Sequence, residues 1–211
     1  MRLLPGKQER RARLCQVMYL GERIAHRCAQ RQAALALEPR HRRFLQLQAR
    51  QETMHALLFR SIVARLDPRG NHASTPAVQA LARYGEQLYQ DIESDDLAAS
   101  LLGMQGTLEG IGERMLHASD SFVTGQDERY QRLHRLVVQQ ESAHHAFGVH
   151  WLQCHQDDRR VRRSLASARL RYQTLAQDLW LACGDLLEDI GIDAGIWLLH
   201  DNTPVKRITA V

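Results

Sequence analysis

The pattern Glu-x-x-His occurs twice in the 211-residue sequence, at Glu52–His55 and at Glu141–His144. In an α-helix, residues three apart lie on one face, so each carboxylate and imidazole can reach the same ion. One such pair is common by chance. Here each pair follows a helical segment with a central glutamate, Glu22 or Glu109, which indicates a metal site assembled from two halves of the chain.

The distances of these glutamates from the predicted turns support one site. The first two lie 16 residues before and 14 residues after Glu38, and the other two lie 16 residues on either side of Gly125. At about 1.5 Å per residue, antiparallel helices place each pair at nearly the same height. Packing the two halves together would gather four carboxylates and two imidazoles in one interior layer.

Such a layer cannot be a passive core. Four buried carboxylates repel one another and lose their hydration, so they need protons or cations. Two divalent ions neutralise them, and mixed oxygen and nitrogen ligands suit iron or manganese. In the alternative, the glutamates face solvent or pair with arginines such as Arg23, Arg50 and Arg114, which leaves the doubled motif to coincidence.

Helices must position these residues, and the hydrophobic pattern predicts an all-α helical bundle. We expect long helices over about 8–37, 40–66, 95–123 and 126–155, a shorter one over 76–92, and another over 158–189. Ser74-Thr75-Pro76 is typical of a helix start, and Thr124-Gly125 of a helix end. An irregular tail with Trp197 and Pro204 follows.

The composition fits a single globular domain over residues 1–211, with 44% hydrophobic residues and a net charge of +4. No apolar run approaches the roughly 20 residues that cross a bilayer, and no signal core follows the basic first residues. We therefore expect a cytoplasmic protein. The arginines could bind an anionic partner such as RNA or an acyl-carrier protein, but their spread beside acidic residues favours a solvated surface.

The segments Glu52-Thr53-Met54-His55 and Glu141-Ser142-Ala143-His144, with Glu22 and Glu109, resemble the ligand set of ferritin-like di-iron carboxylate proteins. This superfamily includes ribonucleotide reductase small subunits, rubrerythrins, aldehyde-deformylating oxygenases, demethoxyubiquinone hydroxylases and tRNA-modifying hydroxylases. The resemblance covers about residues 8–155 and does not single out one member. It implies a ferritin-like four-helix bundle, with accessory C-terminal helices over about 158–200.

The resemblance also implies two iron ions, with manganese as an alternative at one or both positions. By this analogy Glu22 and His55 hold one ion, and the equivalent pair of the second half holds the other. The remaining glutamates, Glu52 and Glu141, bridge the two ions. No catalytic residue beyond the metal ligands is predicted.

Three further residues lie near the predicted ligands. Glu113 follows Glu109 by one helical turn and is either an extra ligand, as in rubrerythrin-like sites, or a neighbour of the ligands. His26 and His134 lie one or two turns from a ligand and are either partners of the ligands or ordinary partly buried histidines.

Two patterns beyond the ligands need a structural explanation. The third long helix carries several glycines, among them Gly103 and Gly112, which reflect either close helix packing or space for dioxygen or substrate. The last helix carries leucines that we expect to form one packing face, against the bundle or in a homodimer contact. These are Leu170, Leu175, Leu179, Leu186 and Leu187.

The favoured function is a di-iron oxidase or oxygenase that uses dioxygen to oxidise an unidentified small molecule. The four cysteines form no Cys-x-x-Cys pair, so electrons would come from a separate reductase or from the substrate. One alternative is peroxide detoxification or iron storage, as in rubrerythrins and ferritins. Another is a tRNA-modifying hydroxylase, which only the arginine content suggests.

Overall fold

The computed structural model describes residues 5–68, 70, 74–119 and 127–192, and every regular element within these ranges is helical. The all-α prediction is therefore confirmed. The predicted turn at Thr124-Gly125 and the tail with Trp197 and Pro204 lie outside the described residues. The elements are α1 (Pro5–Leu35), α2 (Pro39–Leu66), α3 (Pro76–Glu93), α4 (Leu97–Gly103), the π-helical η1 (Met104–Leu108), α5 (Glu109–Ala118), α7 (Glu128–Cys154), α8 (Arg159–Ala182) and α9 (Gly184–Glu188).

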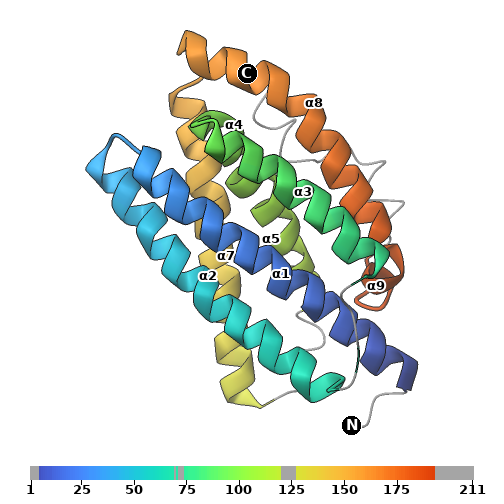
Figure 1. Cartoon of the computed structure of the whole chain (residues 1–211). Coiled ribbons are helices and arrows are strands. Elements are labelled where there is room, and N and C mark those ends of the chain that lie inside the picture. Colours follow the sequence, from blue (N-terminus) through green and yellow to red (C-terminus); the bar gives the residue numbers. More distant parts are fainter. Residues whose placement is uncertain (1–4, 69, 71–73, 120–126, 193–211) are drawn as a thin grey trace.

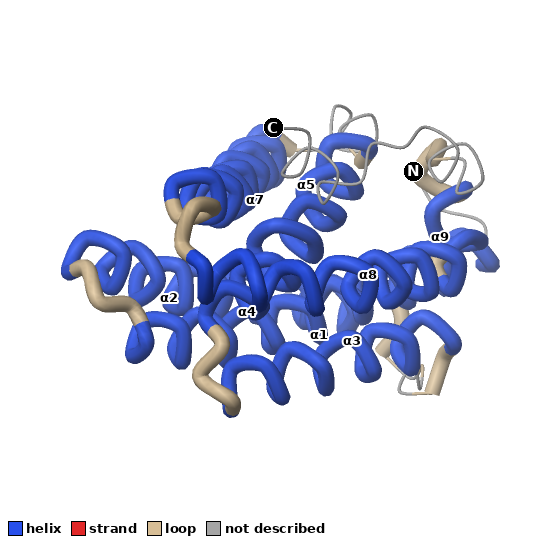
Figure 2. The backbone as a smooth tube through the Cα atoms, turned by 90° about the horizontal axis from the view of Figure 1, so that it is seen from above, coloured by secondary structure: helices blue, strands red, loops and turns tan. Residues whose placement is uncertain are grey.

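The helices form a bundle, with α3 and α8 lying along it (Figure 1). α1 and α2 lie side by side as a long hairpin, and α7 packs against α5 and η1 (Figure 2). α3 and α8 contact each other and cover α1 and α4 respectively. Within the described residues, no helix is both long and apolar enough to cross a membrane.

Capping residues define where several helices begin. Pro39 and Pro76 occupy the first turns of α2 and α3, where their missing N–H is not needed. Thr75 accepts a hydrogen bond from the Val78 N–H at 3.4 Å, so the predicted cap of α3 is confirmed. Asp158 caps α8 in the same way.

The third long helix differs from the prediction of one continuous α-helix, because a π-helical segment separates α4 from α5. Thr107 Oγ1 donates to the Leu102 carbonyl at 2.8 Å within this segment. The carbonyl of Gln105 accepts a hydrogen bond from His145 Nδ1 of α7 at 2.8 Å. The wider π turn thus ties the helix to α7 immediately before Glu109, the first residue of α5.

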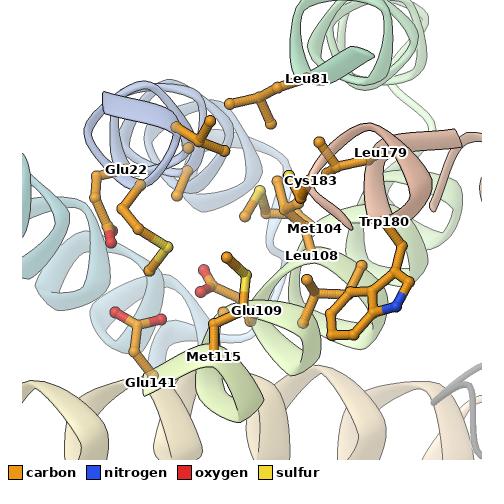
Figure 3. A pocket seen from close by; sticks show the side chains of 16 residues that line it. Glu22, Leu81, Met104, Leu108, Glu109, Met115, Glu141, Leu179, Trp180 and Cys183 are labelled. Atoms are coloured by element: carbon orange, nitrogen blue, oxygen red, sulfur yellow. The ribbon is translucent and has the colours of Figure 1, made fainter. Parts of the chain in front are cut away.

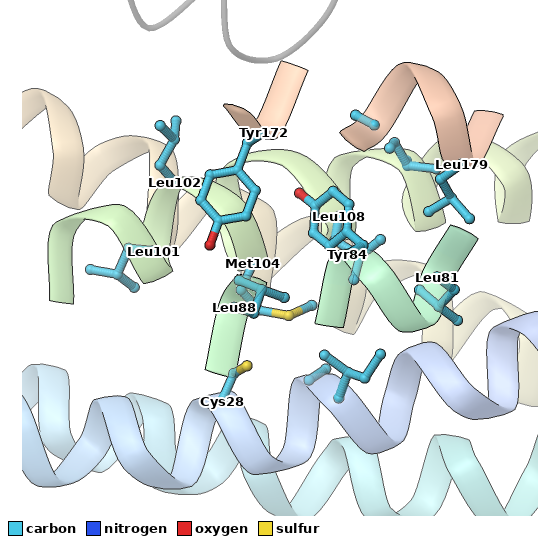
Figure 4. Packing of buried hydrophobic residues seen from close by; sticks show 14 of the residues in the cluster. Cys28, Leu81, Tyr84, Leu88, Leu101, Leu102, Met104, Leu108, Tyr172 and Leu179 are labelled. Atoms are coloured by element: carbon cyan, nitrogen blue, oxygen red, sulfur yellow. The ribbon is translucent and has the colours of Figure 1, made fainter. Parts of the chain in front are cut away.

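The core beside α3, α4 and α8 is apolar but contains two buried tyrosines (Figure 4). Tyr84 donates to the Gly103 carbonyl at 2.7 Å, and Tyr172 donates to Asp91 at 2.5 Å. Arg171 also donates to Asp91, at 2.9 Å. These bonds give both buried tyrosine hydroxyls a partner.

The predicted packing face of the last helix is partly wrong. Leu170 is 71% exposed, whereas Leu179, Leu186 and Leu187 are buried and Leu175 packs against the core. The helix also ends at Ala182 and resumes as α9. Spacings of three and four residues define the buried face of α8, and Leu170 falls outside them. That face consists of Leu165, Ala168, Tyr172, Ala176 and Leu179.

A glycine pair tests this packing. A β-carbon on Gly103 would overlap the ring of Tyr172, whereas one on Gly112 would meet no atom within 4 Å. Replacement of Gly103 by alanine should lower the free energy of unfolding by about 1–3 kcal/mol. Gly112→Ala should instead raise it by up to about 1 kcal/mol, because alanine favours helix. Equal urea midpoints for the two variants would contradict the packing.

Candidate metal centre

The bundle brings the six predicted ligands together in its interior, from α1, α2, α5 and α7. None is more than 5% exposed. The set consists of Glu22, Glu52, His55, Glu109, Glu141 and His144. A layer of this kind requires compensating positive charge or protons.

The six side chains form two overlapping groups, in each of which ligand atoms lie within 4.8 Å of one another. Glu22 and His55 occur in one group only, and the matching pair from α5 and α7 occurs only in the other. Glu52 and Glu141 belong to both groups. This geometry suits two metal ions that share two carboxylates. The individual ligand roles remain predictions.

Each histidine directs Nδ1 toward the carboxylates. His55 Nδ1 lies 2.8 Å from Glu141 Oε1, 3.1 Å from Glu52 Oε2 and 3.6 Å from Glu22 Oε2. His144 Nδ1 lies 3.0 Å from Glu52 Oε1 and 3.8 Å from Glu141 Oε2. Both bridging candidates therefore contact both imidazoles.

Two buried atoms of this layer have no hydrogen bond, Glu141 Oε1 and His144 Nδ1. Both lie within 3.0 Å of a polar neighbour, so their orientation, not their distance, prevents hydrogen bonding. Buried polar atoms without partners are costly and rare. Their donor set of oxygen and nitrogen suits a divalent metal, so the residues fit a metal centre.

The outer edge of each imidazole is held by a glutamine of the opposite helix. His55 Nε2 donates to Gln140 Oε1 at 2.8 Å, and His144 Nε2 donates to Gln51 Oε1 at 2.9 Å. Since an amide oxygen can only accept, Nε2 carries a proton, and Nδ1 is the ring nitrogen that faces the carboxylates and can bind a metal once it is deprotonated. Sequence reasoning missed both glutamines, although each precedes its Glu-x-x-His motif and extends the repeat.

A second, fully buried set of glutamines holds the carboxylates. Gln48 Nε2 donates to Glu52 Oε1 and to Glu109 Oε1, each at 2.9 Å. Gln105 Nε2 donates to Gln48 Oε1 at 3.0 Å and to Gln32 at 2.7 Å. This chain of hydrogen-bonded glutamines fixes Glu52 from the first half of the bundle and Glu109 from the second. No residue spacing in the sequence predicts these hydrogen bonds.

The carboxyl groups divide into two protonation classes. Burial, and then repulsion from Glu141, raises the pKa of Glu22 and of Glu109 well above the usual range. Burial also acts against ionisation of Glu52 and Glu141, but the adjacent histidines outweigh it and lower both pKa values. For Glu141, a hydrogen bond from Glu109 acts in the same direction.

Both histidines are held in the charged form when no metal is bound. Burial lowers the pKa of His55, but the adjacent carboxyl groups of Glu141, Glu22 and Glu52 raise it far more. Glu141 and Glu52 likewise overcome burial and raise the pKa of His144 to about 9. Two imidazolium ions then balance two carboxylates, and two divalent metals would balance all four.

The three additional candidates lie outside both groups. Glu113 accepts a hydrogen bond from Ser142 at 2.5 Å. His26 contacts the Ala49 carbonyl at 2.7 Å, on the side of α2 away from the carboxylates, and His134 contacts Ser119 at 3.0 Å. Neither Glu113 nor His26 hydrogen-bonds to a predicted ligand, and the extra-ligand role of Glu113 stays a prediction.

An apolar cavity of about 50 Å³ opens beside the carboxylates (Figure 3). Glu22, Glu109 and Glu141 point into it, whereas neither histidine lines it. The remaining lining comes mainly from apolar side chains of α1, η1, α5 and α8. These include Met18, Leu108, Ile111, Met115 and Trp180. Gly21 and Gly112 also line the cavity, and a β-carbon on either would enter open space.

No protein-family model and no curated protein matches this chain. Among solved structures, the chain is similar to one described as protein 19 with aldehyde deformylating oxidase activity, from Synechococcus. The TM-score is 0.72 at 21% sequence identity, and the alignment covers 96% of this chain and 87% of the other. This likeness confirms the predicted ferritin-like fold, and the buried carboxylate–histidine cluster lies within it.

Metal binding should release protons. At neutral pH two carboxyl groups and two imidazoles hold protons that two divalent ions would displace, or about four per chain. Because protons compete with the metal, affinity should rise with pH through the pKa of His144, about 9, and continue to rise above it while His55 still holds its proton. Calorimetry of zinc binding in buffers of different ionisation enthalpy counts these protons. Glu22→Gln should release one proton fewer, and release of less than one by the parent would contradict the scheme.

A matched pair of substitutions tests which glutamates hold metal. Glu52→Gln should reduce bound iron from about two to less than one per chain, because Glu52 belongs to both ligand groups. Glu113→Gln should retain about two, since Glu113 contacts Ser142 instead. Elemental analysis after anaerobic loading and desalting provides the measurement. Full occupancy in the first variant would exclude the shared role of Glu52.

Proposed function

We propose that this protein is a di-iron oxidase or oxygenase that uses dioxygen to oxidise an apolar small molecule. The observation that carries the proposal is the pair of overlapping ligand groups beside an apolar cavity. Glu22 and His55 would hold one iron, and Glu109 and His144 would hold the other. Glu52 and Glu141 would bind both irons. Two bound ferrous ions would supply electrons to dioxygen.

The chain's own residues would keep the reaction ordered. Gln48 holds Glu52 and Glu109 in place, and Gln51 and Gln140 fix the histidine rings. Such outer contacts commonly change metal affinity by about 10–100-fold. The site would therefore be organised before substrate arrives, which favours a defined reaction over release of reactive oxygen species.

The cavity supports an apolar substrate. Its carboxylates come from Glu22, Glu109 and Glu141, and most of its remaining lining is apolar, so a polar molecule would find partners only at the carboxylate end and would lose hydration elsewhere. Its volume of about 50 Å³ accommodates dioxygen or a short apolar group. Gly21 and Gly112 leave this space open on the ligand-bearing helices α1 and α5.

The alternative of peroxide detoxification loses its main support, because Glu113 contacts Ser142 and lies outside both ligand groups. Iron storage and tRNA modification gain no specific observation. Sedimentation distinguishes storage, which requires a large many-subunit particle. The proposed oxidase or oxygenase does not require such a particle, because one chain supplies all six predicted metal ligands.

Rapid mixing tests the proposal directly. Protein loaded with two ferrous ions should retain them after desalting, consume dioxygen and develop near-ultraviolet absorption as the iron is oxidised. Oxygen electrodes and stopped-flow spectra give the measurement. Retention of no iron, or oxidation that is faster with hydrogen peroxide than with dioxygen, would refute the proposed function.

A variant that fills the cavity distinguishes an effect on dioxygen access from an effect on metal binding. Gly112→Leu should fill the cavity, retain about two irons per chain and slow oxidation by dioxygen several-fold, because the side chain enters the open space. Gly112→Ala is the matched control and should have a smaller effect. An unchanged rate in the leucine variant would show that dioxygen reaches the site by another route.

A further inference from the structure

Exposed apolar side chains flank the line where α2 meets α7. On α2, Leu47 is 52% exposed and Met54 is 64% exposed. On α7, Leu133 is 40% exposed and Leu136 is 49% exposed. Large apolar side chains that gather on one surface usually mark an interaction site.

Helical spacing places both groups of side chains beside this line. Leu47 and Met54 lie four residues before and three residues after Gln51, and share its face. Leu136 lies four residues before Gln140 and likewise shares its face. Since Gln51 bonds to α7 and Gln140 bonds to α2, the two apolar groups border the same seam. We call this surface the α2–α7 face.

The rim of the α2–α7 face is basic. Arg43 of α2 and Arg132 of α7 each lie four residues before a leucine of this face, Leu47 or Leu136. Both arginines are exposed, and neither forms an ion pair within the described residues. The acidic residues of the two helices are few. Glu52 and Glu141 are buried in the metal centre, and Glu128, the first residue of α7, is exposed. The face therefore combines an apolar centre with unpaired positive charge.

The metal centre lies directly beneath this face, on its imidazole side. Gln51 and Gln140 each contact a histidine Nε2, at 2.9 and 2.8 Å. One glutamine and one imidazole thus connect the surface to the carboxylate layer. The apolar cavity adjoins the carboxylates instead, and neither histidine lines it. A partner on the α2–α7 face could reach the centre without entering the cavity.

We propose that the α2–α7 face binds an acidic one-electron carrier protein, whose electrons enter through His144 and His55. The inference rests on the proposed function, which needs such a donor. Oxidation of an apolar substrate follows R–H + O2 + 2e− + 2H+ → R–OH + H2O, so a C–H and an O–O bond break while a C–O bond forms. Two carrier molecules would each give up one electron, and solvent would supply the protons.

Among the described residues, the groups that could hold a metal all belong to the centre itself, so no second metal site can act as an internal donor. The groups that could hold a metal contain no cysteine, and the described cysteines form no disulfide. Cys28 and Cys183 are buried, which raises the pKa of each thiol to about 12 and keeps both unreactive. Reduction must therefore come from outside this part of the chain.

Charge and polarity favour an acidic protein over the other occupants. A second copy docked on the same face would bring unpaired arginines together, which is unfavourable. A nucleic acid would satisfy the arginines but leave the leucines and Met54 without apolar contact. An acidic protein with an apolar patch satisfies both requirements.

Calorimetric titration with flavodoxin, an acidic one-electron carrier, tests the inference on the iron-loaded protein. The double variant Arg43→Glu, Arg132→Glu should weaken binding at least about tenfold, because attraction becomes repulsion. The matched control Arg159→Glu, Arg163→Glu inverts two exposed arginines of α8 and should change it less than about twofold. Met54→Gln should also weaken binding, through lost apolar contact.

The outcomes separate this inference from the proposed function. Dithionite reduces without docking, so dioxygen uptake by dithionite-reduced wild type tests the proposed function alone. If that uptake occurs but flavodoxin does not bind, or both double variants weaken binding equally, only the docking inference is overturned. Dissociation of a homodimer by the α2–α7 substitutions, or preferential binding of RNA at this face, would also overturn it.

Discussion

Electroneutrality in a dry layer of four glutamates is the constraint on which the rest of the structure depends. The carboxylates are at most 5% exposed, so water cannot stabilise their charge. The metal-free protein meets the constraint by protonating two carboxyl groups and both imidazoles. A pair of divalent ions would meet it differently, with every ligand deprotonated. The same side chains thus have two self-consistent charge states, and the bundle provides the frame common to both.

The two halves of the helical bundle supply the metal centre in the same way, as the repeated Gln-Glu-x-x-His motif in the sequence indicates. Each half supplies a helix with one of the unshared ligand glutamates, Glu22 or Glu109, and a helix with Gln-Glu-x-x-His, and each glutamine secures the histidine of the other half. The two halves are nevertheless not equivalent. Within the described residues, a π-helical segment occurs only before Glu109, and it supplies Gln105, whereas Gln32 and Gln48 of the buried glutamine chain come from α1 and α2. This asymmetry separates the apolar cavity from the imidazole side of the centre.

The sequence predicts the fold and the composition of the cluster because both follow from short-range patterns. Three local patterns carry the prediction: helix periodicity, proline positions and a doubled motif at matched distances from the turns. Together they place Glu22 and Glu52 at the same height along the bundle axis. Other features depend on contacts between distant residues. Nothing near Gln48 or Gln105 indicates that each is buried, since glutamine usually lies at the surface. Leu170 was misplaced because the buried face of α8 depends on Tyr172 and Leu179, which face α3 and α4.

Because of the π turn, the geometry of the metal centre depends on the exact number of residues in the helical segment before Glu109. Such a turn contains one residue more than the α-helical turn it replaces. Loss of a single residue between Met104 and Leu108 would restore regular α geometry and rotate the preceding residues by about 100° relative to Glu109. Gln105 would then leave the glutamine chain, and Gly103 would leave the ring of Tyr172. Deletions are therefore far more damaging in this segment than most point substitutions, and alignments of distant relatives should be anchored here without gaps.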